Sequence, residues 1–184
     1  MEPLNKRLND ADPAAFVELY DELGDRLFRY VLAQTGCRQN AADITQNIFL
    51  RLVKSHRKLA QAENLTAYVF RIARTETIRW HNKLTAGKTK SVPDVEQVVS
   101  SFRNDSGNFT EQIESRDWIN RTLARLDPID REIVQLKIFS QLTFQEISEI
   151  LKLPQANIAT KYRRALMKME KQIGRDTLSQ EREQ

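Results

Sequence analysis

The sequence predicts an all-α protein made of two small helical domains joined by a flexible linker, and three observations predict this class. Apolar residues recur at the helical spacing of three and four over most of the chain, and no strand of useful length is apparent. An Asp-Pro pair, a typical helix start, occurs at Asp12 and again at Asp127. From Thr85 to about Thr110 the periodicity fails, and Gly, Ser, Asn and Pro accumulate as in a linker.

Composition narrows the class of protein further. The 184 residues are 40% hydrophobic and 29% charged, as in globular proteins. No run approaches the length of a membrane span and the amino terminus has no hydrophobic signal core, so we expect a cytoplasmic protein without a membrane span. A single cysteine, Cys37, excludes an internal disulfide and fits a reducing compartment. Because the formal net charge is only +4, the placement of basic residues is more informative than their excess.

The first domain, predicted over residues 10–84, begins with a helix that has clear ends. Asp12 is expected as its N-cap and Pro13 as its first residue, where the missing N–H of proline costs nothing. Gly36 is expected to end this helix. The apolar residues of helical period that should form its inner face are Phe16, Leu19, Tyr20, Leu23, Leu27, Tyr30 and Val31.

Two further helices are expected in this domain, beginning near Asn40 and near Thr66. A basic, irregular stretch from Ser55 to Asn64 should connect them. Their expected inner residues are Ala41, Ile44, Ile48, Phe49, Leu52 and Val53 in one and Val69, Ile72 and Ala73 in the other. Polar residues without an apparent partner nearby in sequence occupy the other face of the first of these helices; they are Asp43, Gln46, Asn47 and Arg51.

The last helix of the first domain interleaves cations with aromatic residues. The cationic and aromatic residues at its end are Arg71, Arg74, Arg79, Trp80, His81 and Lys83. Such a pattern suits unpaired nucleic acid, because bases stack on aromatic rings while Arg and Lys follow the phosphates. The alternative is that Tyr68, Phe70 and Trp80 belong to the core; for Tyr68 and Phe70 both readings stay open, whereas Trp80 is expected to keep an exposed edge.

The second domain is predicted over residues 111–174, after a linker of residues 85–110 and before a polar tail of residues 175–184. Its first helix should carry Ile113, Trp118, Ile119, Leu123 and Leu126, and its second, which starts at Asp127-Pro128, should carry Ile129, Ile133 and Leu136.

A helix-turn-helix is expected at the end of this domain. Thr143 and Glu146 have the spacing of a capping box, and Leu153 is forced out of the helical region because Pro154 follows it. The second helix, with Pro154 as its expected first residue, should bury Ile158, Tyr162, Ala165, Leu166, Met169 and Ile173. Its other face offers Gln155, Asn157, Thr160, Lys161, Arg163, Arg164 and Lys168. Most basic faces are only solvated surface, but the cap, the break and the basic helix in succession favour a helix that reads a DNA major groove.

Five segments together resemble the extracytoplasmic-function sigma factors, the small two-domain specificity subunits of bacterial RNA polymerase. Residues 42–50 resemble the family's polymerase-binding helix, and residues 68–74 resemble the helix that helps to hold the melted −10 element. Residues 126–132, 143–151 and 164–166 resemble the domain that reads the −35 element. The motifs occur in the family's order around a linker, and the resemblance runs from about Phe16 to Met169.

The resemblance implies that this chain is an alternative sigma factor that binds core polymerase and directs promoter-specific initiation. It implies docking on the clamp helices of the β′ subunit through Asp43, Gln46, Asn47, Phe49 and Arg51. It implies capture of the opened −10 strand by His56, Arg57, Lys58, Asn64, Arg74, Arg79 and Trp80. It implies −35 contacts by Gln155, Asn157, Thr160, Lys161, Arg163, Arg164 and Lys168. The implied partners are core RNA polymerase, including its β flap, and promoter DNA, with an anti-sigma factor as a further candidate.

Two other classes compete with this interpretation. A stand-alone helix-turn-helix regulator would explain the second domain but not the motifs of the first, and it would usually be a dimer, whereas we expect a monomer. An enzyme is disfavoured because the two histidines, His56 and His81, lie in different segments and no metal-ligand spacing, glycine-rich phosphate loop or nucleophile–base pattern is present. We therefore expect no cofactor, no metal and no catalytic residue.

Overall fold

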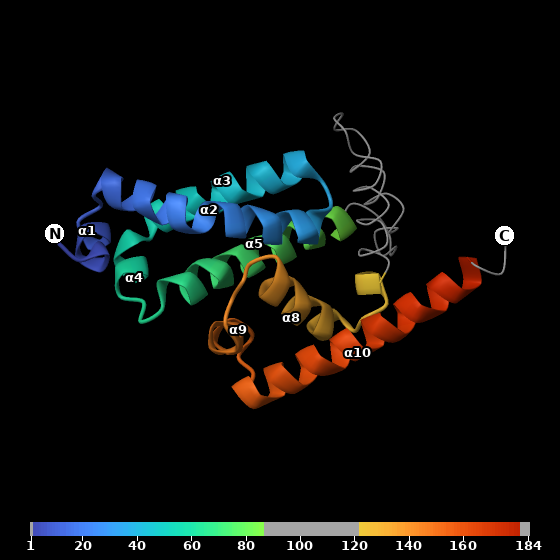
Figure 1. Ribbon diagram of the computed structural model, residues 1–184. Helices are drawn as coiled ribbons and strands as arrows, with labels where there is room; N and C mark the ends of the chain where they lie inside the picture. Colours follow the sequence, from blue (N-terminus) through green and yellow to red (C-terminus); the bar gives the residue numbers. More distant parts are fainter. Residues whose placement is uncertain (1, 87–121, 181–184) are drawn as a thin grey trace.

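Every regular element that the structure, a computed structural model, describes is a helix (Figure 1). The structure describes residues 2–86 and 122–180. The first group of helices is α1 (Leu4–Asn9), α2 (Pro13–Thr35), α3 (Arg38–Lys54), α4 (His56–Ala60) and α5 (Leu65–Ala86). The second group is α8 (Pro128–Ile138), α9 (Phe144–Leu151) and α10 (Gln155–Gln180). The prediction of an all-α fold is confirmed. Helix α5 ends at Ala86, two residues inside the predicted linker, and residues 87–110 of that linker and most of the helix expected before residue 126 lie outside the described residues.

The ends of α2 follow from its sequence as expected. The Asp12 carboxylate accepts a hydrogen bond from the Ala14 amide at 2.9 Å, and Pro13 is the first helical residue. At the other end Gly36 adopts a left-handed conformation with φ of 66° and donates its amide to the Leu32 carbonyl. The second Asp-Pro pair differs, because the Asp127 side chain caps no amide of α8.

The helix-turn-helix has the predicted capping box. The Glu146 amide donates to the Thr143 hydroxyl at 3.2 Å, and the Thr143 amide donates to the Glu146 carboxylate at 2.7 Å. The turn passes through Lys152 with φ of 58°. The Pro154 carbonyl accepts the first backbone hydrogen bonds of α10, from the amides of Asn157 and Ile158. Pro154 therefore precedes α10 rather than opening it, a shift of one residue.

Other bounds of the helices also differ from the prediction. Helix α1 lies before the expected start of the first domain at residue 10, and α4 forms within the stretch that was expected to be irregular. Both helices are too short for the spacing of apolar residues to reveal them. Helix α10 continues through residue 174 to Gln180, into the predicted tail. A glycine inside a helix costs only about 1 kcal/mol relative to alanine, so the glycine at residue 174 does not end it.

Helices α2, α3 and α5 pack together and bury most of the predicted inner faces. Some residues predicted at the edges of these inner faces are exposed, however. Tyr20 is 56% exposed, Val53 44% and Leu166 37%. Tyr20 and Val53 lie on α2 and α3, whose outer surfaces therefore carry more apolar area than expected.

The two groups of helices pack directly against each other. We call them the amino-terminal module (α1 to α5) and the carboxyl-terminal module (residues 122–180). One continuous cluster of buried apolar side chains contains Leu27 and Phe70 from the first and Ile133 and Ile147 from the second. Helix α9 contacts α5, and α8 contacts α2, while α10 lies along the outer side of α8 and α9 (Figure 1). The face of α5 next to α8 and α9 is therefore covered.

Candidate functional site

The outer face of α3 presents most of the residues predicted to bind polymerase. Asp43, Gln46 and Asn47 are exposed on this face. Arg51 instead forms an ion pair with Glu76 on α5, so its guanidinium helps to join two helices of the amino-terminal module. Phe49 is half-buried, and its ring packs against the ring of Tyr20 on α2 with centroids 4.9 Å apart.

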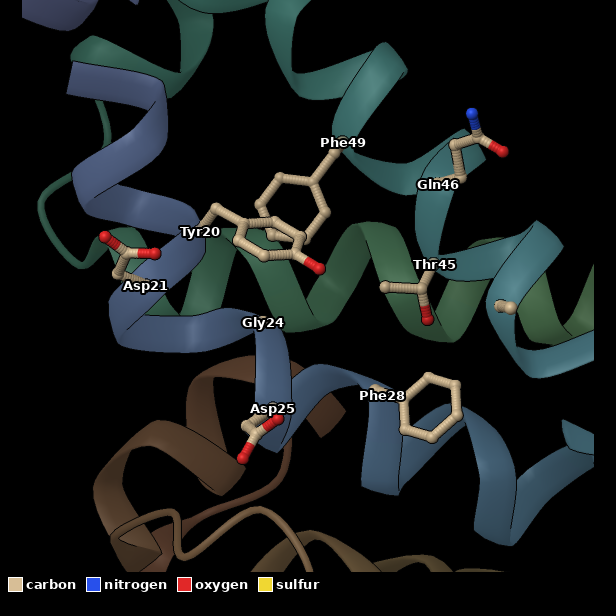
Figure 2. Close-up of a pocket in the computed structure, with 9 residues that line it drawn as sticks. Tyr20, Asp21, Gly24, Asp25, Phe28, Thr45, Gln46 and Phe49 are labelled. Atoms are coloured by element: carbon tan, nitrogen blue, oxygen red, sulfur yellow. The ribbon is translucent and has the colours of Figure 1, made fainter. Parts of the chain in front are cut away.

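A groove of about 560 Å³ lies beside this face, between α2 and α3 (Figure 2). Its lining residues are Tyr20, Asp21, Gly24, Asp25, Phe28, Ala42, Thr45, Gln46 and Phe49. The Tyr20 and Phe49 rings lie together on one side, and the Thr45 side chain extends from α3 toward α2. Of these lining residues, only Gln46 and Phe49 were expected on a binding surface, because nothing in the sequence brings residues 20–28 next to them.

His56, predicted to contact DNA, is engaged within the protein. Its Nδ1 lies 3.0 Å from the carbonyl oxygen of Asn9 and 3.2 Å from that of Leu8 at the end of α1. Both partners are acceptors, so Nδ1 carries the proton and donates. The side chain of Leu8 is fully buried. Helix α1 thus fastens α4, on which the predicted strand-binding residues Arg57 and Lys58 are exposed.

This geometry gives a test of the role of His56. We expect His56→Asn to keep most of the stability, because the asparagine amide can donate from nearly the position of Nδ1. Replacement by alanine should lower the free energy of unfolding by about 1 kcal/mol, since the hydrogen bond to α1 is lost. Urea unfolding measures both effects. Full stability of His56→Asn combined with loss of single-strand DNA binding would instead support a direct DNA contact by His56.

Other residues of the predicted −10 set also have structural partners. Asn64 caps α5 by accepting the Ala67 amide at 2.9 Å. Arg79 donates to Glu76 at 3.0 Å and remains exposed. Trp80 is half-buried, as its position between Arg79 and His81 predicted, and its ring lies 4.8 Å from that of His81.

Arg74 forms a bidentate ion pair between the two modules. Its Nε and Nη2 donate to the two carboxylate oxygens of Glu132 on α8, at 2.7 and 3.2 Å. This hydrogen-bonded carboxylate raises the pKa of the Arg74 guanidinium above its usual range. The hydroxyl of Tyr30 also donates to Glu132, at 3.3 Å, and burial raises the pKa of that hydroxyl. A DNA phosphate at Arg74 would therefore have to replace Glu132 as its acceptor.

Further hydrogen bonds join the modules around this pair. Gln34 donates to the side chain of Gln135 at 2.9 Å, and Gln135 donates to the Ala33 carbonyl at 3.2 Å. The Arg26 guanidinium donates to the carbonyl of Ser140 at 2.8 Å. None of these contacts was predicted from the sequence, since each joins residues about one hundred positions apart.

The predicted DNA-reading face of α10 divides into two groups. Gln155, Asn157, Thr160, Arg163 and Arg164 are exposed along it. The two lysines of the set are paired with acidic residues of the same module. Lys161 lies 3.3 Å from the buried carboxylate of Asp130, and Lys168 lies 3.0 Å from the exposed carboxylate of Asp127. The hydrogen bond with Lys168 lowers the pKa of Asp127 and raises that of the lysine.

The described residues contain neither a group of metal ligands nor a membrane-spanning helix. Among residues 2–86 and 122–180, no three His, Cys, Asp or Glu side chains are grouped as metal ligands. Within the same ranges no helix has the length and apolar character needed to cross a bilayer.

Comparison with known families identifies two matches along the chain. Residues 19–86 match the family described as sigma-70 region 2, and residues 116–169 match the family described as sigma-70, region 4. The two matched segments together include more than half of the chain. The first contains the outer face of α3 and the cation-rich helix α5, and the second contains the helix-turn-helix.

Similar proteins align with this chain over most of its length. The sigma factor SigW of Bacillus subtilis is 22% identical over 91% of this chain and 94% of its own. The sigma factor BldN of Streptomyces coelicolor is 24% identical over 90% of this chain, which spans 63% of BldN. Among solved structures, CnrH in complex with the cytosolic domain of CnrY superposes with a TM-score of 0.69 over 94% of this chain and 96% of its own, at 18% identity. RpoE of Bartonella quintana, solved in complex with the anti-sigma factor NepR, superposes with a TM-score of 0.60 over 85% of this chain and 97% of its own, at 16% identity.

Proposed function

This chain belongs to the extracytoplasmic-function sigma factors, and on that premise we propose that it binds core RNA polymerase and directs transcription from specific promoters. The observation that carries the proposal is the presence, on one chain, of an exposed polar face on α3 and an exposed amide- and arginine-bearing face on α10. The first lies in the region 2 match and the second in the region 4 match. A regulator that only bound DNA would leave the face of α3 without a task.

In this proposal the outer face of α3 docks on the β′ clamp helices. Asp43, Gln46 and Asn47 are the direct contacts, because each is exposed. Phe49 contributes an apolar edge beside them. Arg51 connects α3 to α5 through its ion pair with Glu76. Replacement of Arg51 should therefore lower the stability of the amino-terminal module more than it weakens polymerase binding.

Capture of the opened −10 strand is assigned to the basic residues around α4 and α5. Arg57, Lys58 and Arg79 are exposed and can follow phosphates, while Trp80 offers a partly exposed ring for stacking. Asn64 and His56 hold the ends of helices and thereby position their basic neighbours. Arg74 can contribute only when it exchanges Glu132 for DNA.

The −35 element is assigned to α10. Thr160, Arg163 and Arg164 are placed at base edges, where a good bidentate contact discriminates by about 1–3 kcal/mol. Gln155 and Asn157 lie exposed at the start of the same helix and complete this surface. Lys168 is suited to a phosphate, since it is exposed and its salt bridge with Asp127 lies at the surface. Lys161 is a weaker candidate, because it neutralises the buried Asp130.

The remaining partners follow from the same assignment. The carboxyl-terminal module would lie near the β flap of the polymerase, and the protein would work in the cytoplasm as a monomer when free. An anti-sigma factor is a candidate regulator, because RpoE was solved in complex with the anti-sigma factor NepR and CnrH in complex with the cytosolic domain of CnrY. No catalytic role is proposed.

Run-off transcription tests the function directly. Core polymerase should produce discrete transcripts from a library of genomic fragments only when this protein is added. A stand-alone regulator would instead bind a palindromic site as a dimer without polymerase and would give no transcript with core enzyme. That result would reject the sigma-factor proposal.

A further inference from the structure

Two acidic residues at the start of α8 are paired with the lysines of the DNA-reading face of α10. The Asp130 carboxylate lies 3.3 Å from the ammonium group of Lys161 and 3.8 Å from that of Lys168. Lys168 lies closer, at 3.0 Å, to the carboxylate of Asp127. Both lysines of the predicted set therefore have carboxylate partners within the carboxyl-terminal module.

Helical spacing places both lysines at the edge of the DNA-reading face. Lys161 follows Asn157 by four residues and precedes Arg164 by three, and Lys168 follows Arg164 by four. Residues at these spacings are neighbours on a helix surface. On the other side, Ala165 follows Lys161 by four residues and is fully buried in the core of the module. Lys161 thus stands between the buried stripe of α10 and the exposed residues assigned to DNA.

The two carboxylates differ in their exposure, and this difference determines which lysine is available to DNA. The side chain of Asp130 is 8% exposed, whereas that of Asp127 is 71% exposed. An exposed ion pair exchanges its partner at little cost, because water and salt already screen it. A buried carboxylate without a cation is costly, so Asp130 retains one. When Lys168 moves to a DNA phosphate, Lys161 remains as the cation beside Asp130.

We propose that Asp130 is a specificity-determining residue of the DNA-reading face, because it withholds Lys161 from the phosphates of DNA. Contacts between lysines and phosphates provide affinity for any sequence and carry no sequence information. Suppression of one such contact lowers binding to non-target DNA, and the base contacts assigned to Arg164 then decide more of the total. The inference rests on the proposed function and refines its assignment of α10.

The competing explanation is that Asp130 only fastens two helices together. Its two lysine partners lie two turns apart on α10, which contacts α8, so the pairing also holds these helices to each other. Loss of a fastening alone would weaken stability and DNA binding together. If Asp130 withholds Lys161, its loss should instead lower stability while it strengthens binding to non-target DNA.

Asp130→Asn in the full chain is the direct test. Once its counter-charge is removed, Lys161 should bind one more phosphate, so that the slope of log affinity against log salt on a duplex without promoter sequence steepens by about 0.9. Affinity for this duplex at about 0.1 M salt should rise about fivefold. The melting temperature should fall by about 2–4 °C, because the buried ion pair is lost. Fluorescence anisotropy of a labelled duplex and scanning calorimetry measure these changes.

Asp127→Asn is the matched control, because it removes the same charge from the same end of α8. Lys168 leaves this exposed carboxylate for a phosphate in the wild-type complex as well, so the salt slope should not change. Asp130→Asn combined with Lys161→Met should return the slope to its wild-type value. Lys161→Gln, which keeps a donor beside Asp130, should also have the wild-type slope, and this variant tests the inference even if Asp130→Asn does not fold.

The outcomes separate the inference from the proposed function. The inference is overturned if Asp130→Asn does not steepen the slope, if Asp127→Asn steepens it equally, or if Lys161→Gln makes it shallower by about 1. Selection of −35 duplexes by holoenzyme carrying Asp130→Asn measures discrimination, which should fall about fivefold. Base contacts hold α10 at one register on a target, whereas on other duplexes the protein can slide to a register that suits Lys161. A wild-type chain that gives no transcript with core polymerase rejects the proposed function, while the salt slopes still decide whether Asp130 withholds Lys161.

Discussion

Simultaneous replacement of Asp43 and Gln46 by alanine is expected to abolish stable binding to core RNA polymerase. Both side chains are exposed on one face of α3, three residues apart and therefore neighbours on the helix surface. Central residues of an interface commonly contribute 2 kcal/mol or more each when truncated, so the double variant should lose at least about 100-fold in affinity even with incomplete additivity. A pull-down with core enzyme, or a titration by fluorescence anisotropy, measures the change.

The fold should survive this double replacement. Asp43 makes one long contact, from the Gln39 amide at 3.4 Å, and alanine is the strongest helix former. The matched control is Gln145→Ala with Glu149→Ala, which removes another amide–carboxylate pair from a helix of the other module. Unchanged core affinity of the Asp43 and Gln46 variant, with the control also unchanged, would remove α3 from the polymerase contact.

Arg164→Ala is expected to relax sequence preference at the −35 element. Arg164 is exposed on α10, and a bidentate arginine contact to a guanine discriminates by about 1–3 kcal/mol, or roughly 5–150-fold between the right and the wrong base. Selection from a library of −35 duplexes by the holoenzyme should therefore lose information at one or two base pairs. The remaining positions should keep their preference.

The control for this change is Lys168→Ala on the same helix. Lys168 is exposed and is assigned to a phosphate, so its loss should weaken binding on all sequences alike and reduce the slope of log affinity against log salt by about 1. If Arg164→Ala behaves in the same way as Lys168→Ala, with uniform weakening and a shallower salt slope, Arg164 contacts the backbone and not a base.

Local chemistry made several elements predictable. The start and end of α2 follow from Asp12, Pro13 and Gly36, and the helix-turn-helix follows from the Thr143 capping box and the break at Pro154. These signals act over four residues or fewer, so they do not depend on the rest of the fold. Helices α1 and α4 were not predicted, because no such local signal marks them. They pack against each other and around the buried side chain of Leu8.

The candidate site residues were predictable where they lie on one face of a single helix. The exposed residues of α10 and α3 could be assigned from helical spacing, because residues three and four apart share a face. His56, Asn64 and Arg74 show where this reasoning ends. Each has the polarity of a DNA ligand, but their partners, respectively at the end of α1, at the start of α5 and on α8, come from the folded chain.

Caps, breaks and helical periodicity are local signals, so the helical class, the division into two groups of helices and the basic helix α10 could be predicted without knowledge of the fold. Folding, in contrast, brings the Arg74 guanidinium to Glu132 and places Tyr20 and Thr45 in one groove with Phe49. Both outcomes have the same cause. Burial and pairing depend on which distant segments meet, and an arginine, a threonine or a tyrosine has the same local preferences whether or not its partner arrives.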